Sequence, residues 1–208
     1  EFNMKKYILS IIVAIFALCS TNANAQFRYG ATAGVSFSDL SFKQDLVGVE
    51  KMVGPSVGVV GEMMFPGIGF GIDLGLIYSQ RGAKVNLGER LIWSSQGYGN
   101  EKTYLHYIEI PLHLRFKYTN LAGFEDYVAP FVFGGPSLSI LVADNNIKAY
   151  EYASGSLNLT AGFGLELWRR WQISASYSWG MTYALKTTLL DNYSARNYAW
   201  DVKLAYFF

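Results

Sequence analysis

The last eleven residues of the chain, 198–208, alternate strictly between apolar and polar positions. Large apolar side chains occupy every even position from Tyr198 to Phe208, and the odd positions include Asp201 and Lys203. Because a β-strand directs successive side chains to opposite faces, one face of this segment suits lipid and the other suits water. The pattern predicts a strand that crosses a membrane.

Seven earlier segments share this period of two, and each is long enough to cross a bilayer as a tilted strand, which takes about 9 to 11 residues. They lie near residues 27–38, 56–65, 68–81, 104–117, 127–142, 157–167 and 171–183. The fifth is the least regular, because Gly134-Gly135-Pro136 interrupts the alternation and is expected to shift its phase. The prediction is an all-β fold: a closed, antiparallel, up-and-down transmembrane β-barrel of eight strands.

The connections between these segments alternate in length. Short ones lie around Pro66-Gly67, at 119–126 and around Arg169-Arg170, and longer ones cover 41–55, 82–102, 143–154 and 185–195. Outer-membrane barrels have short periplasmic turns and long external loops. Both termini are therefore expected in the periplasm, with the long loops outside the cell.

Two local details of the strands follow from their geometry. A two-residue turn at Arg169-Arg170 would set lipid-facing Leu167 opposite inward-facing Gln172, so an odd loop, Arg169-Arg170-Trp171, or a bulge is expected there. The other detail concerns prolines, since each one removes a donor from the ladder of hydrogen bonds. Bulges or strand ends are expected at Pro111, Pro130 and Pro136.

The segment 4–25 has the three parts of a secretory signal peptide. Lys5 and Lys6 are basic, the next twelve residues are an apolar run, and Ala23-Asn24-Ala25 is a small-x-small cleavage site. The run is too short for a membrane-anchoring helix, which needs about 20 residues. Residues 1–3 precede the first methionine and are expected to be cloning residues or upstream translation. The barrel domain is expected to cover 26–208.

Charge and cysteine content narrow the classes of function. Residues 1–25 hold Glu1, Lys5 and Lys6, so removing them reduces 17 basic residues to 15 and 16 acidic residues to 15. A nucleic-acid partner would favour a strong basic excess, so none is expected. Cys19 leaves with the signal peptide, which excludes disulfide and thiol chemistry from the mature chain. An aromatic content of 16% fits a membrane barrel.

The inward positions of the predicted strands carry five basic and five acidic residues. These are Arg28, Arg81, Arg115, Lys117 and Lys203, against Glu62, Asp73, Glu109, Glu166 and Asp201. An isolated buried ion is costly, and eight strands leave an interior just wide enough for side chains. We therefore expect a structural charge network that plugs the lumen. The alternative is a small wet channel with a charged constriction, which inward glycines would favour by leaving volume unfilled.

No catalytic, metal or cofactor site is predicted, and the chain is not expected to be an enzyme. His106 and His113 are seven residues apart on one strand, so they face opposite sides and cannot share a metal. Ile108 occupies the position on the face of His106 where a nucleophilic serine would be needed. Outward aromatics such as Trp171 and Trp200 are interpreted as interfacial girdle residues. The asparagines and charged residues of the loop at 143–154 are interpreted as ordinary solvated loop.

The segment from Tyr107 to Tyr118, YIEIPLHLRFKY, resembles the Y-[IL]-E-I-P-L-L-L-K-Y signature of the PorT-like outer-membrane barrel family of Gram-negative bacteria. Residues 127–131 and 134–138 follow at a suitable spacing and look like the next strand of that family. The resemblance implies a small single-chain barrel and suggests a link to secretion across the outer membrane. His113 stands where the family usually has leucine.

These observations lead to one expected role and one alternative. The expected protein is a small outer-membrane barrel with a structural, binding or secretion-associated role through its external loops; the alternative is a small-solute porin. The expected partners are outer-membrane lipid, the barrel-assembly machinery, and a protein at the external loops or a secretion complex. Leu204, Tyr206 and Phe208 resemble the carboxyl-terminal assembly signal of outer-membrane barrels.

Overall fold

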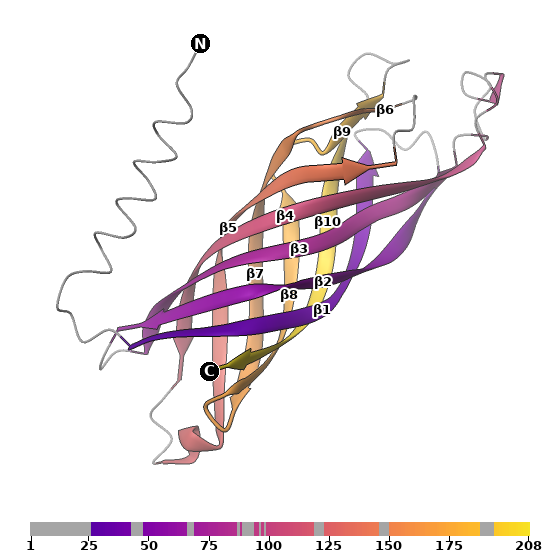
Figure 1. Cartoon of the computed structure of the whole chain (residues 1–208). Helices are drawn as coiled ribbons and strands as arrows, with labels where there is room; N and C mark the ends of the chain where they lie inside the picture. The colour runs from indigo at the N-terminus through magenta and orange to yellow at the C-terminus, as the bar shows by residue number, and fades with distance from the viewer. Residues whose placement is uncertain are drawn as a thin grey trace, which may run out of the picture.

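The computed structural model describes residues 26–42, 48–65, 69–86, 88, 94–95, 97, 99–118, 123–145, 150–187 and 194–208. The fold is a closed antiparallel β-barrel, as the alternation predicts (Figure 1). The predicted signal peptide and the Pro66-Gly67 turn lie outside the described residues. Within the described part of the chain, no helix has the length and apolar character needed to cross a membrane.

Eight long strands form the wall of the barrel. They are β1 (Gln26–Phe42), β2 (Gly48–Met64), β3 (Phe70–Asn86), β4 (Asn100–Lys117), β5 (Val128–Asp144), β7 (Gly155–Leu167), β8 (Trp171–Gly180) and β10 (Ser194–Phe207). Two three-residue strands, β6 (Tyr150–Tyr152) and β9 (Leu185–Thr187), pair with each other, and β9 also pairs with β10. A 3-10 turn, η2 (Phe124–Asp126), lies before β5.

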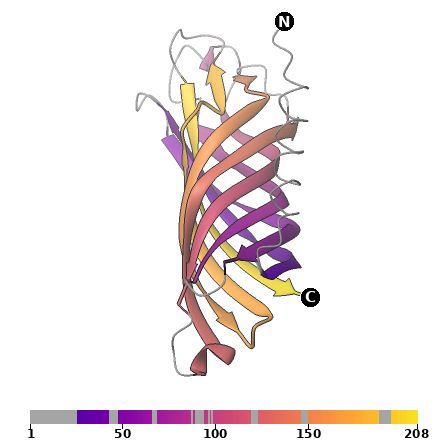
Figure 2. The same cartoon turned by 90° about the vertical axis from the view of Figure 1, so that its left-hand side faces the viewer.

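The first and last strands close the barrel. β1 and β10 pair in register from Gly30 opposite Phe207 to Phe42 opposite Ala195. The backbone N–H of Phe208 donates to the Tyr29 carbonyl at 3.0 Å. The start of β1 and the end of the chain therefore lie at the same end of the barrel, which we call the terminal end, while β6 and β9 lie at the opposite end (Figures 1 and 2).

The two faces of the wall have opposite chemistry. On the outside, Leu114 is 69% exposed and Phe163 is 63% exposed, whereas the inward neighbour Arg115 is only 7% exposed. An apolar outer surface around a polar interior is the reverse of a soluble fold. It is the arrangement that a barrel needs when lipid surrounds it.

The strands are longer than the apolar alternation predicts, and the loops are correspondingly shorter. β2 begins at Gly48 instead of near Ser56, and its early residues pair with the end of β3, which reaches Asn86. The physical reason is that backbone pairing continues after the strand leaves lipid, where its side chains no longer need to alternate. β8 is shorter than predicted: it ends at Gly180, whereas the alternation continued to residue 183.

The predicted phase shift in β5 is wrong. Phe131 and Ser137, on either side of the Gly134-Gly135-Pro136 sequence, are both buried, and Leu138 is exposed. The register with β4 keeps one offset from Leu114 opposite Gly134 to Pro111 opposite Ser137. Two glycines without side chains hide the alternation in the sequence without interrupting it in the strand.

The prolines behave differently from the prediction. Pro130 is the third residue of β5, near a strand end as expected, but Pro111 and Pro136 lie inside strands without a register shift beside them. At Pro111 the neighbouring strand makes room, because a Cβ on Gly75 would lie 3.3 Å from the proline Cγ. The pairing of β3 with β4 is interrupted at Pro111 and resumes in the same register, so the missing donor is accommodated without a bulge.

The predicted odd loop between β7 and β8 is confirmed, one residue earlier than proposed. Leu167 pairs with Trp171, so the loop is Trp168-Arg169-Arg170 and Trp171 begins β8. Trp168 and Arg169 have φ values of 50° and 57°, in the left-handed region. The odd number of loop residues keeps lipid-facing Leu167 opposite lipid-facing Trp171.

Candidate functional site

A cluster of charged side chains crosses the lumen near the terminal end, and we call it the first charge cluster. Its members are Arg28 (β1), Glu62 (β2), Asp73 (β3), Arg115 and Lys117 (β4), Glu166 (β7) and Gln172 (β8). The alternation of six strands directs these side chains inward at one level. Three cations and three anions make the cluster formally neutral.

Glu62 is fully buried and receives donors from several strands. Lys117 Nζ lies 2.7 Å from Glu62 Oε1 and Arg28 Nη2 also lies 2.7 Å from it. The Gln172 amide donates to Glu62 Oε2 at 2.7 Å. A buried carboxylate is stable only when it is paired and hydrogen-bonded in this way.

Arg115 joins the cluster to the wall of the lumen. Its Nη2 lies 2.7 Å from Asp73 Oδ2, and its Nη1 donates to the Gln172 amide oxygen at 3.0 Å. The guanidinium carbon lies 4.0 Å from the centroid of the Phe131 ring, within cation–π range. Arg115 is thus held on one side by a carboxylate and on another by an aromatic face.

A second charge cluster lies further from the terminal end. It consists of Arg81, Glu109 and Asp201 with the hydroxyls of Ser36 and Ser79. Arg81 Nη2 lies 2.7 Å from Glu109 Oε1 and 3.5 Å from Asp201 Oδ2. Ser79 donates to Glu109 at 2.8 Å, and Ser36 donates to Asp201. Arg81 is only 2% exposed, so the cluster is withdrawn from solvent.

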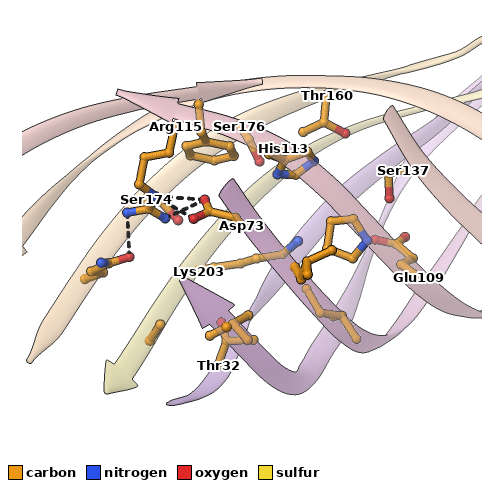
Figure 3. A pocket seen from close by; sticks show the side chains of 18 of the residues that line it. Thr32, Asp73, Glu109, His113, Arg115, Ser137, Thr160, Ser174, Ser176 and Lys203 are labelled. Carbon is orange, nitrogen blue, oxygen red and sulfur yellow. Dashed lines mark hydrogen bonds and ion pairs between the residues drawn. The ribbon is translucent and has the colours of Figure 1, made fainter. Parts of the chain in front are cut away.

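Between the two clusters lies a cavity of about 80 Å³ (Figure 3). Lys203 extends into this region between Asp73 and Glu109, and it forms no hydrogen bond or ion pair with the described residues. His113 Nε2 is buried there without a hydrogen-bond partner in the same part of the chain, and its ring stacks on Phe133 at 5.3 Å. The lining is largely apolar but includes Asp73, Glu109, His113 and Lys203, and the volume suits a few water molecules beside these polar groups.

An apolar cap fills the lumen at the end opposite the termini. It consists of Leu40, Ala83, Val85, Tyr150, Ala184, Leu185 and Ala195. Leu185, in β9, is fully buried, and Tyr150, in β6, is 5% exposed. The interpretation of the asparagines and charges of 143–154 as solvated loop did not extend to Tyr150, whose ring is buried in the apolar cap.

Nine of the ten predicted lumen charges fall into the two clusters. They form two separate groups of ion pairs instead of one network. Lys203 has no ion pair within 4 Å among the described residues, although its charge acts on Asp201 of the second cluster. Gln172 was predicted to face inward but was not counted in the lumen network, which held charged residues alone. It lies directly opposite Glu166 on the neighbouring strand. Sequence reasoning also missed the inward rings of Phe131 and Phe133, whose tips occupy the space beside Gly164 and Gly162. Those two glycines therefore leave less free volume than the channel alternative assumed.

The residues of the predicted assembly signal lie on the outer wall, and the two histidines lie on opposite faces of β4. The ring of Tyr206 lies 4.8 Å from Trp171 and 5.5 Å from Phe208, and Leu204 is exposed. His106 bonds the Tyr78 hydroxyl through Nδ1 at 2.7 Å and lies on the opposite face from His113. Among the described residues, no group of three or more His, Cys, Asp or Glu could hold a metal ion.

Comparison with known proteins agrees with the membrane chemistry of the wall. Residues 20–185 match the family described as outer membrane protein beta-barrel domain. No curated protein gives a significant match.

Solved structures with a similar strand arrangement include Ail, the attachment invasion locus protein of Yersinia pestis, at 15% identity and a TM-score of 0.47, covering 88% of this chain and 99% of that one. Neisserial surface protein A has 12% identity and a TM-score of 0.47, covering 86% and 96%. The outer membrane enzyme PagL has 12% identity and a TM-score of 0.41, covering 82% and 97%.

Proposed function

The chain belongs to the family of outer membrane protein β-barrel domains, and from this premise we propose that it is a closed barrel with a structural or binding role instead of a channel or an enzyme. The observation that carries the proposal is the blocked lumen. The first charge cluster, the second charge cluster and the apolar cap fill it at three successive levels. A solute would have to break buried ion pairs to pass, which costs several kcal/mol for each ion left unpaired.

The proposed role lies at the loops on the cap side of the barrel. With both termini in the periplasm, these loops face the outside of the cell, and the strands that carry them continue beyond the apolar band. The partner we propose is a protein bound by these loops, in a structural or secretion-associated assembly. The resemblance of Tyr107–Tyr118 to the PorT-like signature supports the link to secretion.

A small-solute channel is the second candidate. The cavity lined by Lys203 favours it, because this ammonium has no ion pair within 4 Å among the described residues, only a longer-range interaction with Asp201, and could attract a passing anion. The first cluster lies on one side of this cavity and the second cluster on the other. Conduction would therefore require both clusters to open.

Measuring conductance separates the two candidates. We expect the purified barrel, reconstituted in planar bilayers, to show no steady current. Glu109→Lys replaces the closest partner of Arg81 with a second cation, so it should lower the free energy of unfolding by about 3 to 5 kcal/mol. A stable wild-type current whose ion selectivity responds to Glu109→Lys, with an unchanged unfolding midpoint, would support the channel instead.

The binding role needs its own test in cells. Exchange of the loops at 87–99 and 145–149 for short glycine-serine segments should abolish crosslinking to the neighbouring protein while leaving the amount of inserted barrel unchanged. Identical crosslinked products from the exchanged and unchanged proteins would exclude a role for these loops.

A further inference from the structure

The cavity between the two charge clusters is lined by two nitrogen-bearing side chains that belong to neither cluster (Figure 3). Lys203, on β10, extends into it without an ion pair within 4 Å among the described residues, although its charge acts on Asp201. His113, on β4, is 9% exposed, and its Nε2 has no hydrogen-bond partner in the same part of the chain. A buried polar atom in this condition is costly, so a ligand that pairs with it is favoured.

The carboxylates beside the cavity are engaged elsewhere. Asp73 accepts from Arg115 Nε at 2.8 Å through both of its oxygens. Glu109 pairs with Arg81 at 2.7 Å. A lysine ammonium has three donors and no acceptor, whereas water brings donors as well as acceptors. The group that suits Lys203 best is therefore one that only accepts hydrogen bonds, which is an anion.

Charge balance adds a condition. The ten lumen charges are five basic and five acidic, so an anion alone would leave one buried negative charge uncompensated. A proton on His113 restores neutrality and makes both ring nitrogens donors. The charged groups around this ring are Asp73, directly opposite on β3, Arg115, two positions along β4, and Lys203, while Phe133 of β5 stacks on it. The two cations oppose protonation of the empty site, and an anion between His113 and Lys203 removes that repulsion.

We propose that the cavity binds one small monovalent anion, such as chloride, together with a proton on His113. The anion accepts hydrogen bonds from Lys203 Nζ and His113 Nε2, beside the hydroxyls of Ser174 and Ser176 on the β8 wall. A volume of about 80 Å³ admits a monatomic anion and a few water molecules. Gluconate, a long hydroxylated carboxylate, is too large for it. The site is internal, so it requires neither conduction nor a partner at the loops.

Histidine NMR tests this assignment on the full barrel. The protein, labelled with nitrogen-15 at histidine, is refolded into micelles in sodium chloride or in sodium gluconate of equal ionic strength, so that the ion enters before the lumen closes. In chloride, His113 should stay protonated to a higher pH than in gluconate, because the anion and the proton favour each other's binding. The chloride affinity should fall about tenfold for each unit that the pH rises above the titration of the empty site, since one proton accompanies each anion. His106, on the outer face, should titrate alike in both salts.

Two variants remove the two donors separately. His113→Leu introduces the residue that the PorT-like signature usually has at this position, so the barrel should still fold. Wild-type protein should unfold at a higher urea concentration in chloride than in gluconate, because the anion binds only the folded state. His113→Leu and Lys203→Met should each unfold at equal midpoints in the two salts. His106→Gln is the control and should keep the wild-type response.

Crystals grown in bromide give the position of the ion, and an anomalous-scattering peak is expected between Lys203 and His113. Absence of that peak, an identical titration of His113 in the two salts, or an equal effect of chloride on wild type and His113→Leu would overturn the proposal. These readouts depend neither on conductance nor on the external loops, so the anion site can fail while the proposed role stands.

Discussion

The ring of Phe131 on β5 occupies the space that a side chain at Gly164 on β7 would need. A Cβ at position 164 would lie 2.4 Å from Phe131 Cζ and 2.5 Å from the carbonyl oxygen of Ile173. The same ring supports the guanidinium of Arg115 on the lumen side. The glycine thus allows an aromatic ring, and with it a charge of the first cluster, to fit inside a narrow barrel.

Gly164→Ala should therefore destabilise the barrel. The added methyl group has no free space, and overpacking of this kind costs about 1 to 3 kcal/mol. Urea unfolding of the refolded protein, followed by tryptophan fluorescence, measures the change. Gly155→Ala is the matched control, because its Cβ would meet only the Ser139 carbonyl at 3.5 Å, an ordinary contact. Equal midpoints for the two variants would contradict the packing described here.

Glu62→Gln should be more costly. It keeps the shape of the side chain but leaves Lys117 and Arg28 with a neutral partner in a buried site, a loss of about 3 to 5 kcal/mol in the free energy of unfolding. The control is Glu50→Gln, whose carboxylate is 70% exposed and pairs with Lys84. An exposed pair contributes at most about 1 kcal/mol. If both variants unfold at the wild-type midpoint, solvent screens the first cluster and the lumen is wet.

Deletion of Phe208 should reduce insertion of the barrel without altering the protein that does insert. Phe208 is 71% exposed and contributes one backbone hydrogen bond, to Tyr29, so its loss removes little packing. A large drop in membrane level would then reflect recognition by the assembly machinery. Val202→Ala, on the lipid face of the same strand, is the comparison. Undiminished levels of both variants in outer-membrane fractions would count against a signal role.

The mature protein should begin at Gln26, because Ala23 and Ala25 are the small residues that signal peptidase accepts. Amino-terminal sequencing of protein extracted from membranes checks this boundary. Retention of residues 5–25 in the extracted protein would show that the segment is not cleaved.

The sequence predicts the wall of the barrel well, because lipid imposes a strict rule on every second residue. Leu114 and Arg115 are neighbours in the chain, and their opposite environments could be assigned from the alternation alone. The inward charges could be assigned in the same way. Their division into two clusters could not be predicted, because it depends on the register between neighbouring strands. Glu109 and Arg115, for example, lie on one strand but belong to different clusters.

The apolar cap was beyond sequence reasoning for a different reason. β6 and β9 have three residues each, too few to show a period, and Tyr150 stands in a stretch rich in polar residues. The phase of β5 was obscured by two adjacent glycines. In both places the missing information is spatial: which strand lies opposite, and what fills the volume that it leaves.

The pairing of β1 with β10 also constrains the order in which the barrel can fold. Gly30 meets Phe207 only after nearly every residue between them has been synthesised and exported, so the pairing with the greatest separation along the chain is also the last that can form. Contacts of this kind are slow to establish. Until they form, both edge strands expose unpaired backbone, which no bilayer tolerates. A chain that stops short of its final strand therefore leaves this edge of β1 without a partner and cannot close the barrel.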